Sequence, residues 1–136
     1  MKQSNYSTSF ENQFNIKQYI TTEYGNVETV DITPQHLRSP IPIVFVPGFR
    51  ETPELQKACM HELSKKGYRV LTLVYNYQLQ QKDNMEKFPP TEVQKENIIL
   101  DILKGKNIKK IDIVTHSLGS ITSVITASRN PLLCRN

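Results

Sequence analysis

The chain has 136 residues, of which 38% are hydrophobic and 22% charged, a composition that fits one soluble globular domain and excludes two of ordinary size. Its 17 basic and 13 acidic residues give a formal net charge of +4, without a block of like charges or a nucleic-acid-binding motif, so we expect no nucleic-acid partner. No apolar run approaches the ~18 residues that a membrane span requires, and we expect no membrane span and a cytoplasmic location.

The basic stretch "KGKNIKK" at residues 104–110 precedes a predicted strand. We interpret it as a solvated helix end and turn, where lysine also suits the negative end of the helix dipole. The alternative is a patch that binds nucleic acid or an anionic membrane. Cys59 and Cys134 show neither a disulfide framework nor metal-ligand spacing, so the sequence predicts no metal site and no cofactor.

The N-terminal region predicts a leader followed by a β-hairpin. Residues 1–13 are polar and lack a periodic pattern, so we expect a flexible leader there and a single domain over residues 14–136. Two runs rich in β-branched and aromatic residues follow, separated by "EYGN" around Gly25. This pattern indicates an antiparallel hairpin with a tight turn.

From residue 43 onward, predicted strands alternate with predicted helices. The strands are expected over 43–46, 68–76 and 111–115, and the helices over 52–67, 91–107 and about 118–130. A polar connection at 77–90 interrupts this series. Crossover helices between strands give parallel pairing, so the predicted fold class is α/β: an antiparallel hairpin followed by three parallel strands with flanking helices.

Ser117, in "IVTHSLGS", lies between the strand over 111–115 and the next helix. A hydroxyl is a weak nucleophile, and a sharp strand-to-helix turn exposes it at the carboxyl edge of the sheet, where α/β ligands bind. Such a turn requires small residues two positions away on either side. Gly119 meets this requirement, and Thr115 meets it less fully. The alternative interpretation of Ser117 is a helix N-cap.

The segment Pro47-Gly48-Phe49 ends the predicted strand over 43–46. Acyl transfer places negative charge on a carbonyl oxygen, and backbone N–H groups aimed at that oxygen lower the barrier. We expect the N–H groups of Phe49 and Leu118 to be such donors.

The motifs "THSLGS" and "PGF", with the order of the elements, resemble the N-terminal portion of an α/β-hydrolase of the esterase and lipase type. The resemblance covers about residues 14–130. It implies that Ser117 is the nucleophile and that a small ester is the substrate. It also implies oxyanion donors and supporting residues in the two loops: Phe49 and Leu118 as donors, and Gly48, Thr115, His116 and Gly119 as support. Proline at 47 and threonine at 115 depart from the histidine and glycine common in the family.

In this family the acid and the histidine of the catalytic triad follow the nucleophile in the chain. The sequence contains no Asp, Glu or His after Ser117. His116 adjoins the nucleophile, but neighbours on a tight turn point apart, and we interpret His36 and His61 as surface residues. We therefore expect a chain truncated before the acid and the histidine, and inactive by itself.

Two other function classes compete with a hydrolase. A non-catalytic α/β interaction module, or pseudo-hydrolase, would use the exposed edge of the strand over 111–115 to associate with itself or with a partner. A nucleotide-binding domain is disfavoured, because no glycine-rich phosphate-binding motif follows the strand over 43–46.

Overall fold

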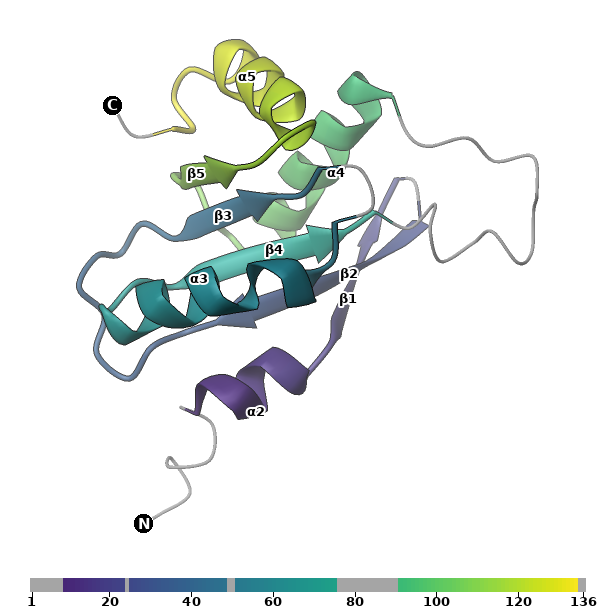
Figure 1. Ribbon diagram of the computed structural model, residues 1–136. Helices are drawn as coiled ribbons and strands as arrows, with labels where there is room; N and C mark the ends of the chain where they lie inside the picture. The colour runs from purple at the N-terminus through teal and green to yellow at the C-terminus, as the bar shows by residue number, and fades with distance from the viewer. Residues whose placement is uncertain (1–8, 24, 49–50, 76–90, 135–136) are drawn as a thin grey trace.

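The computed structural model describes residues 9–23, 25–48, 51–75 and 91–134 (Figure 1). Its strands are β1 (Gln18–Thr22), β2 (Gly25–Ile32), β3 (Ile43–Val46), β4 (Val70–Val74) and β5 (Asp112–Thr115), and its helices are α2 (Phe10–Asn15), α3 (Pro53–Lys65), α4 (Glu92–Gly105) and α5 (Gly119–Arg129). The predicted connection at 77–90 lies outside the described residues. Among the described helices, none has the length and apolar character needed to cross a membrane.

The five strands form one sheet in the order β1-β2-β4-β3-β5. β1 and β2 form the predicted antiparallel hairpin, and β2 is also antiparallel to β4. β4, β3 and β5 are parallel, with Phe45 of β3 paired to Thr72 on one side and to Val114 on the other. The predicted α/β fold class is confirmed. The parallel arrangement brings the carboxyl ends of β3 and β5 side by side.

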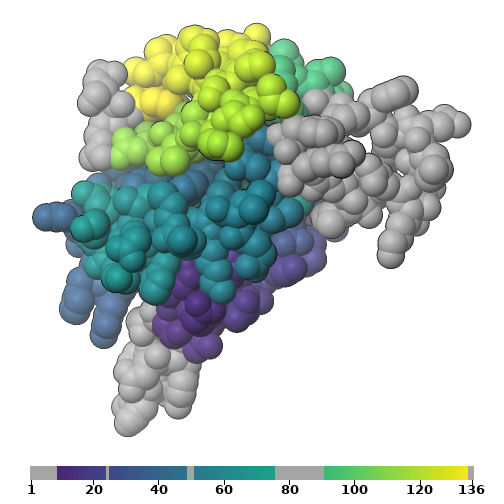
Figure 2. Space-filling model, viewed as in Figure 1, coloured from purple at the N-terminus to yellow at the C-terminus, as the bar shows by residue number. Residues whose placement is uncertain are grey.

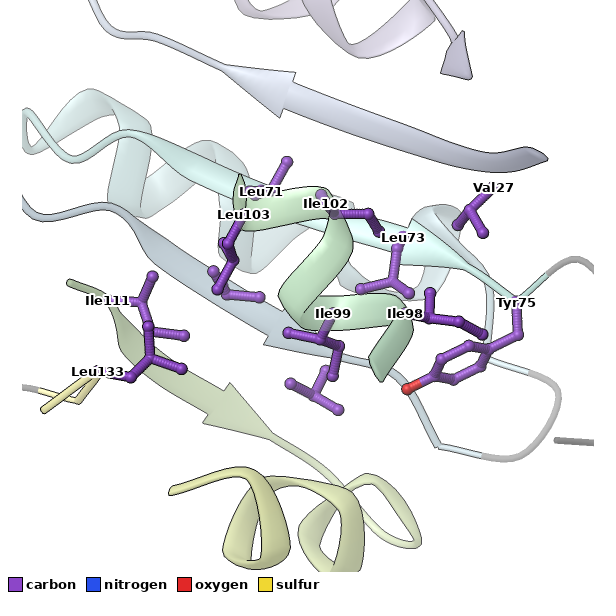
Figure 3. Packing of buried hydrophobic residues seen from close by; sticks show 12 residues of the cluster. Val27, Leu71, Leu73, Tyr75, Ile98, Ile99, Ile102, Leu103, Ile111 and Leu133 are labelled. Carbon is purple, nitrogen blue, oxygen red and sulfur yellow. The ribbon is translucent and has the colours of Figure 1, made fainter. Parts of the chain in front are cut away.

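Helices cover both faces of the sheet: α3 lies in front of it in Figure 1, and α4 lies behind. The α4 face carries the larger apolar cluster, in which α4 packs its buried side chains on β3 and β4 (Figure 3). The opposite cluster joins Phe14 of α2 and Met60 of α3 to the other face of the strands. Burial on both faces explains why β3 reads as an unbroken apolar run in the sequence and why β4 is apolar except at the buried Thr72.

Residues 10–13, which the sequence placed in a flexible leader, instead form most of helix α2. Ser9 caps the helix by accepting a hydrogen bond from the Asn12 N–H at 3.3 Å. Phe10 and Phe14 lie one turn apart with ring centroids 5.6 Å from each other, and Phe14 is 3% exposed. Burial of these two rings supplies the apolar anchor that holds this short helix on the sheet.

The basic stretch at 104–110 also differs from the expectation of a fully solvated surface. Lys106 Nζ lies 2.8 Å from Asp31 Oδ2, and its side chain is 11% exposed. Arg69 donates two hydrogen bonds to the same carboxylate, at 2.9 and 2.7 Å. Burial alone would raise the pKa of Asp31, but the hydrogen bonds from Arg69 and Lys106 outweigh it and hold that pKa below its ordinary value.

The C-terminal segment returns to the sheet after α5. Cys134 forms an isolated parallel bridge with Ile111, and the Ile111 N–H donates to the Leu133 carbonyl at 2.9 Å. Figure 3 shows the Ile111 and Leu133 side chains next to each other at the margin of the core. Burial raises the pKa of the Cys134 thiol, and the nearby Asp112 carboxylate raises it further. This segment therefore lies along the start of β5.

Candidate active site

Ser117 lies in a sharp turn between β5 and α5, with a backbone φ of 57°. Positive φ is uncommon for residues other than glycine and costs about 1–3 kcal/mol, so it persists where the surroundings impose it. Here the Gly119 N–H donates to the His116 carbonyl at 3.1 Å, and the Ser120 N–H donates to the Ser117 carbonyl at 3.0 Å. These bonds close the turn around an exposed serine.

The N-cap interpretation of Ser117 is wrong. The N-cap of α5 is Leu118, which has helical backbone angles, and no side chain caps the helix. Within the described ranges, the Ser117 hydroxyl has no hydrogen-bond partner. The serine therefore presents its hydroxyl without using it to satisfy the first N–H groups of the helix.

Gly119 allows α5 to begin directly against the end of β3. A Cβ atom at this position would lie 2.4 Å from the Val46 carbonyl oxygen and 2.8 Å from Thr115 Oγ1. Neither contact is compatible with a side chain. Close packing thus requires glycine at position 119. Thr115 fits on the other side of the turn because its side chain faces Gly119, which has no side chain of its own.

Gly48 brings the loop after β3 against the same turn. A Cβ atom on Gly48 would lie 3.1 Å from the His116 carbonyl oxygen and 3.4 Å from the Leu118 nitrogen. Two motifs separated by some seventy positions in the sequence are therefore in contact. Leu118, which is 49% exposed, follows the serine at the start of α5. Phe49, the other expected donor, lies outside the described residues.

Glu51 belongs to this site and was missed in the sequence. Its carboxylate accepts a hydrogen bond from the Gly48 N–H, and its Oε2 lies 3.4 Å from His116 Nδ1. The Glu51 side chain is 13% exposed, whereas that of His116 is 80% exposed. An acidic residue three positions after Gly48 was the available signal, but its inward orientation depends on the loop geometry.

A groove of about 440 Å³ opens between α3 and β5, beside the elbow, the turn over residues 115–119 that carries Ser117. Its elbow end is lined by Glu51, Thr115 and His116, and its remaining lining includes Leu55 of α3 and Val114 of β5. In Figure 2 the yellow-green surface of α5 lies above the teal surface of α3. The surface of β5 lies between these two helices and is open to solvent. Val114 is accordingly 37% exposed.

The other histidines are not brought to Ser117. His61 is exposed on α3 and stacks on Phe10, with ring centroids 4.4 Å apart. His36 is exposed in the connection between β2 and β3, and it lines with His61 a pocket that shares no residue with the groove at the elbow. In the part of the chain that the structure describes, no three His, Cys, Asp or Glu side chains gather as a metal site.

No protein-family model and no curated protein sequence matches the chain, whereas solved structures match its fold. Naproxen esterase (carboxylesterase NP) from Bacillus subtilis matches with a TM-score of 0.71, 20% identity, and coverage of 98% of this chain and 45% of that one. A structure from a study of carboxylesterases of the thaumarchaeon Nitrososphaera gargenis matches with a TM-score of 0.68, 23% identity, and coverage of 86% and 42%.

An epoxide hydrolase from an endophytic Streptomyces also matches, with a TM-score of 0.68, 16% identity, and coverage of 88% of this chain and 34% of that one. This chain thus spans between 34% and 45% of the length of these three structures. At these identities the likeness concerns the fold. The chain has the α/β-hydrolase fold, of which it forms the N-terminal part.

Proposed function

We propose that this chain carries the nucleophile and the oxyanion-binding elements of a serine hydrolase that acts on small carboxylic esters. The observation that carries the proposal is the positive φ of Ser117, an exposed serine on a strand-to-helix turn. Strain of this kind is concentrated at functional sites. The esterases and the epoxide hydrolase that share the fold support a hydrolytic reaction.

In the proposed reaction, Ser117 Oγ attacks the ester carbonyl carbon and the hydroxyl proton passes to a base. The oxyanion that forms accepts hydrogen bonds from the N–H of Leu118 and, as the second donor, the N–H of Phe49. The protonated base then gives its proton to the departing alkoxide, which leaves as an alcohol, and water, deprotonated by the same base, hydrolyses the acyl-enzyme to the acid and restores Ser117. Gly48, Thr115, His116 and Gly119 shape the two loops.

The triad order of the family requires an acid and a histidine after the serine, and the sequence has no Asp, Glu or His after Ser117. Removing triad members typically lowers such rates by several orders of magnitude and leaves what the oxyanion hole and binding provide. We therefore expect turnover of p-nitrophenyl acetate by this chain alone to be weak or absent.

The test is labelling with a fluorophosphonate probe, followed by peptide mapping of the modified residue. We expect slow labelling that is lost in Ser117→Ala and retained in Ser128→Ala, a matched change at an exposed position of α5. Labelling that persists in Ser117→Ala would refute the proposed nucleophile. Fast labelling that depends on Ser117 would show that a base serves it within this chain.

A second candidate is a non-catalytic interaction module that associates through β5. β5 pairs with β3 along one edge, and among the described residues its other edge is paired through the Ile111–Cys134 bridge alone. The apolar groove beside Val114 adjoins that edge. A defined dimer by light scattering, with cooperative unfolding, would favour this candidate, whereas a monomer that labels at Ser117 would favour the hydrolase.

A further inference from the structure

Glu51 lies where the loop after β3 meets the turn of Ser117. Its carboxylate accepts the Gly48 N–H, and its own backbone N–H donates to the Gly48 carbonyl at 3.3 Å. Two hydrogen bonds therefore join Gly48 and Glu51 across the loop. The second carboxylate oxygen lies 3.4 Å from His116 Nδ1, on the residue that precedes the serine.

The orientation of this carboxylate is unusual for an acid in a surface loop. The Glu51 side chain is 13% exposed, although a carboxylate is strongly stabilised by water. A charged acceptor makes a stronger hydrogen bond to a backbone N–H than a neutral one does, which offsets the lost hydration. The carboxylate is therefore held by the loop and by the turn, and a solvated acid would not make these contacts.

Both partners of Glu51 contact the start of α5. The Cα of Gly48 faces the His116 carbonyl oxygen and the Leu118 nitrogen, which would lie 3.1 and 3.4 Å from a Cβ placed there. A displacement of Gly48 would therefore alter the surroundings of the Leu118 N–H directly. The Glu51 carboxylate fixes Gly48 from one side, and the turn limits it from the other.

We propose that Glu51 is a positioning residue for the proposed hydrolase. Its carboxylate holds Gly48 against the turn of Ser117. Gly48 in turn sets the surroundings of the Leu118 N–H, which donates a hydrogen bond to the oxyanion. This inference rests on the proposed function. Glu51 acts through Gly48 and His116 and does not touch the substrate.

The first measurement is the amide ¹H–¹⁵N spectrum of the full chain, with Gly48 and Leu118 assigned. Glu51→Gln keeps an acceptor of the same shape without the charge, and Glu51→Ala removes the acceptor. Because the bond to a charged acceptor deshields the Gly48 amide proton, we expect its signal to move upfield in Glu51→Gln and further in Glu51→Ala, with a parallel change at Leu118. Glu54→Gln and Glu54→Ala, at an exposed position in the first turn of α3, should leave both signals in place.

The second measurement is the rate at which a fluorophosphonate labels Ser117. The phosphoryl oxygen of this probe would occupy the proposed oxyanion site. We expect a loss of about tenfold or more in Glu51→Ala, a smaller loss in Glu51→Gln, and no loss in either Glu54 variant. An unchanged Gly48 signal in Glu51→Gln would overturn the inference, as would Ser117-dependent labelling that both Glu51 variants retain in full. Labelling that survives Ser117→Ala would instead overturn the proposed function, and the amide spectra would still decide whether Glu51 holds Gly48.

Discussion

Val46 and Thr115 are paired neighbours at the carboxyl ends of the parallel strands β3 and β5. Each strand ends at this pair, so the two loops that follow start side by side. The loop after Val46 carries Gly48, and the turn after Thr115 carries Ser117. The candidate site therefore depends on one register in the sheet, and the predictions below test the contacts that this register imposes.

Gly119→Ala should destabilise the protein strongly, because the new methyl group would lie 2.4 Å from the Val46 carbonyl oxygen. We expect a loss of about 2–3 kcal/mol in the free energy of unfolding, measured by urea denaturation. Gly105→Ala is the matched control, since its Cβ would meet only Ile20 Cγ2, at 3.6 Å, among the described neighbours. That variant should be neutral or more stable, and equal losses in both would contradict the packing argument.

Ser117→Gly should be more stable than Ser117→Ala by about 1 kcal/mol, because glycine adopts a φ of 57° without the steric cost that alanine bears. The order should reverse at Ser120, inside the first turn of α5, where alanine favours the helix. Thermal unfolding of the four variants measures both differences. If alanine were as stable as glycine or more stable at Ser117, as it is expected to be at Ser120, the result would argue against strain at Ser117.

Two buried threonines on α5 should respond oppositely to valine. Thr122 donates a hydrogen bond to Glu92 Oε1 at 2.6 Å and is 0% exposed, so Thr122→Val should cost about 1–2 kcal/mol. Thr126, one turn later and equally buried, has a hydroxyl without a hydrogen-bond partner among the described residues. Thr126→Val should be neutral or stabilising, because it removes an unsatisfied polar group. Denaturation curves that rank the two variants the other way would reject this account of the α4–α5 contact.

Asp31→Asn should destabilise the protein by about 2–3 kcal/mol at neutral pH, because it leaves Arg69 and Lys106 facing a neutral group. Glu62→Gln provides the control: Glu62 pairs with Lys65 on the exposed face of α3, where solvent screens the interaction, and no resolvable change is expected. Chemical denaturation at pH 7 measures both. If Asp31→Asn were as stable as the unmodified protein, the contacts of Asp31 with Arg69 and Lys106 would contribute nothing to the free energy of unfolding.

The stability difference between the unmodified protein and Asp31→Asn should also depend on pH. The pKa of Asp31 is lower in the folded protein than its ordinary value, so the unfolded chain takes up the proton first as the pH falls. The difference should be fully present above the unfolded-state pKa of about 3.9 and should decline as the pH falls through the folded-state pKa below it. Denaturation midpoints measured from pH 7 down to the acid limit of folding test this, and a difference that stays constant would contradict the assignment.

Local sequence patterns determined the element types and the fold class. The unbroken apolar run at β3 predicts a strand that is buried on both faces, and the Gly25 turn predicts the hairpin before it. Strands that alternate with helices then require parallel pairing. The sequence could place Ser117 and Gly119 in a sharp turn because such a turn constrains residue size within a few positions, which a sequence shows directly.

Tertiary structure decided everything that depends on contacts between distant segments. Glu51 reads as an ordinary surface acid until the loop after β3 folds back on its own Gly48 and onto His116. Phe10 reads as part of a polar leader until it packs, next to Phe14, against the cluster on one face of the sheet. Lys106 reads as a solvated helix end until β2 places Asp31 beside it. In each case the outcome depends on a contact with a residue remote in the chain, His116 for Glu51, the β-sheet cluster for Phe10 and Asp31 for Lys106, and a local pattern carries no information about that partner.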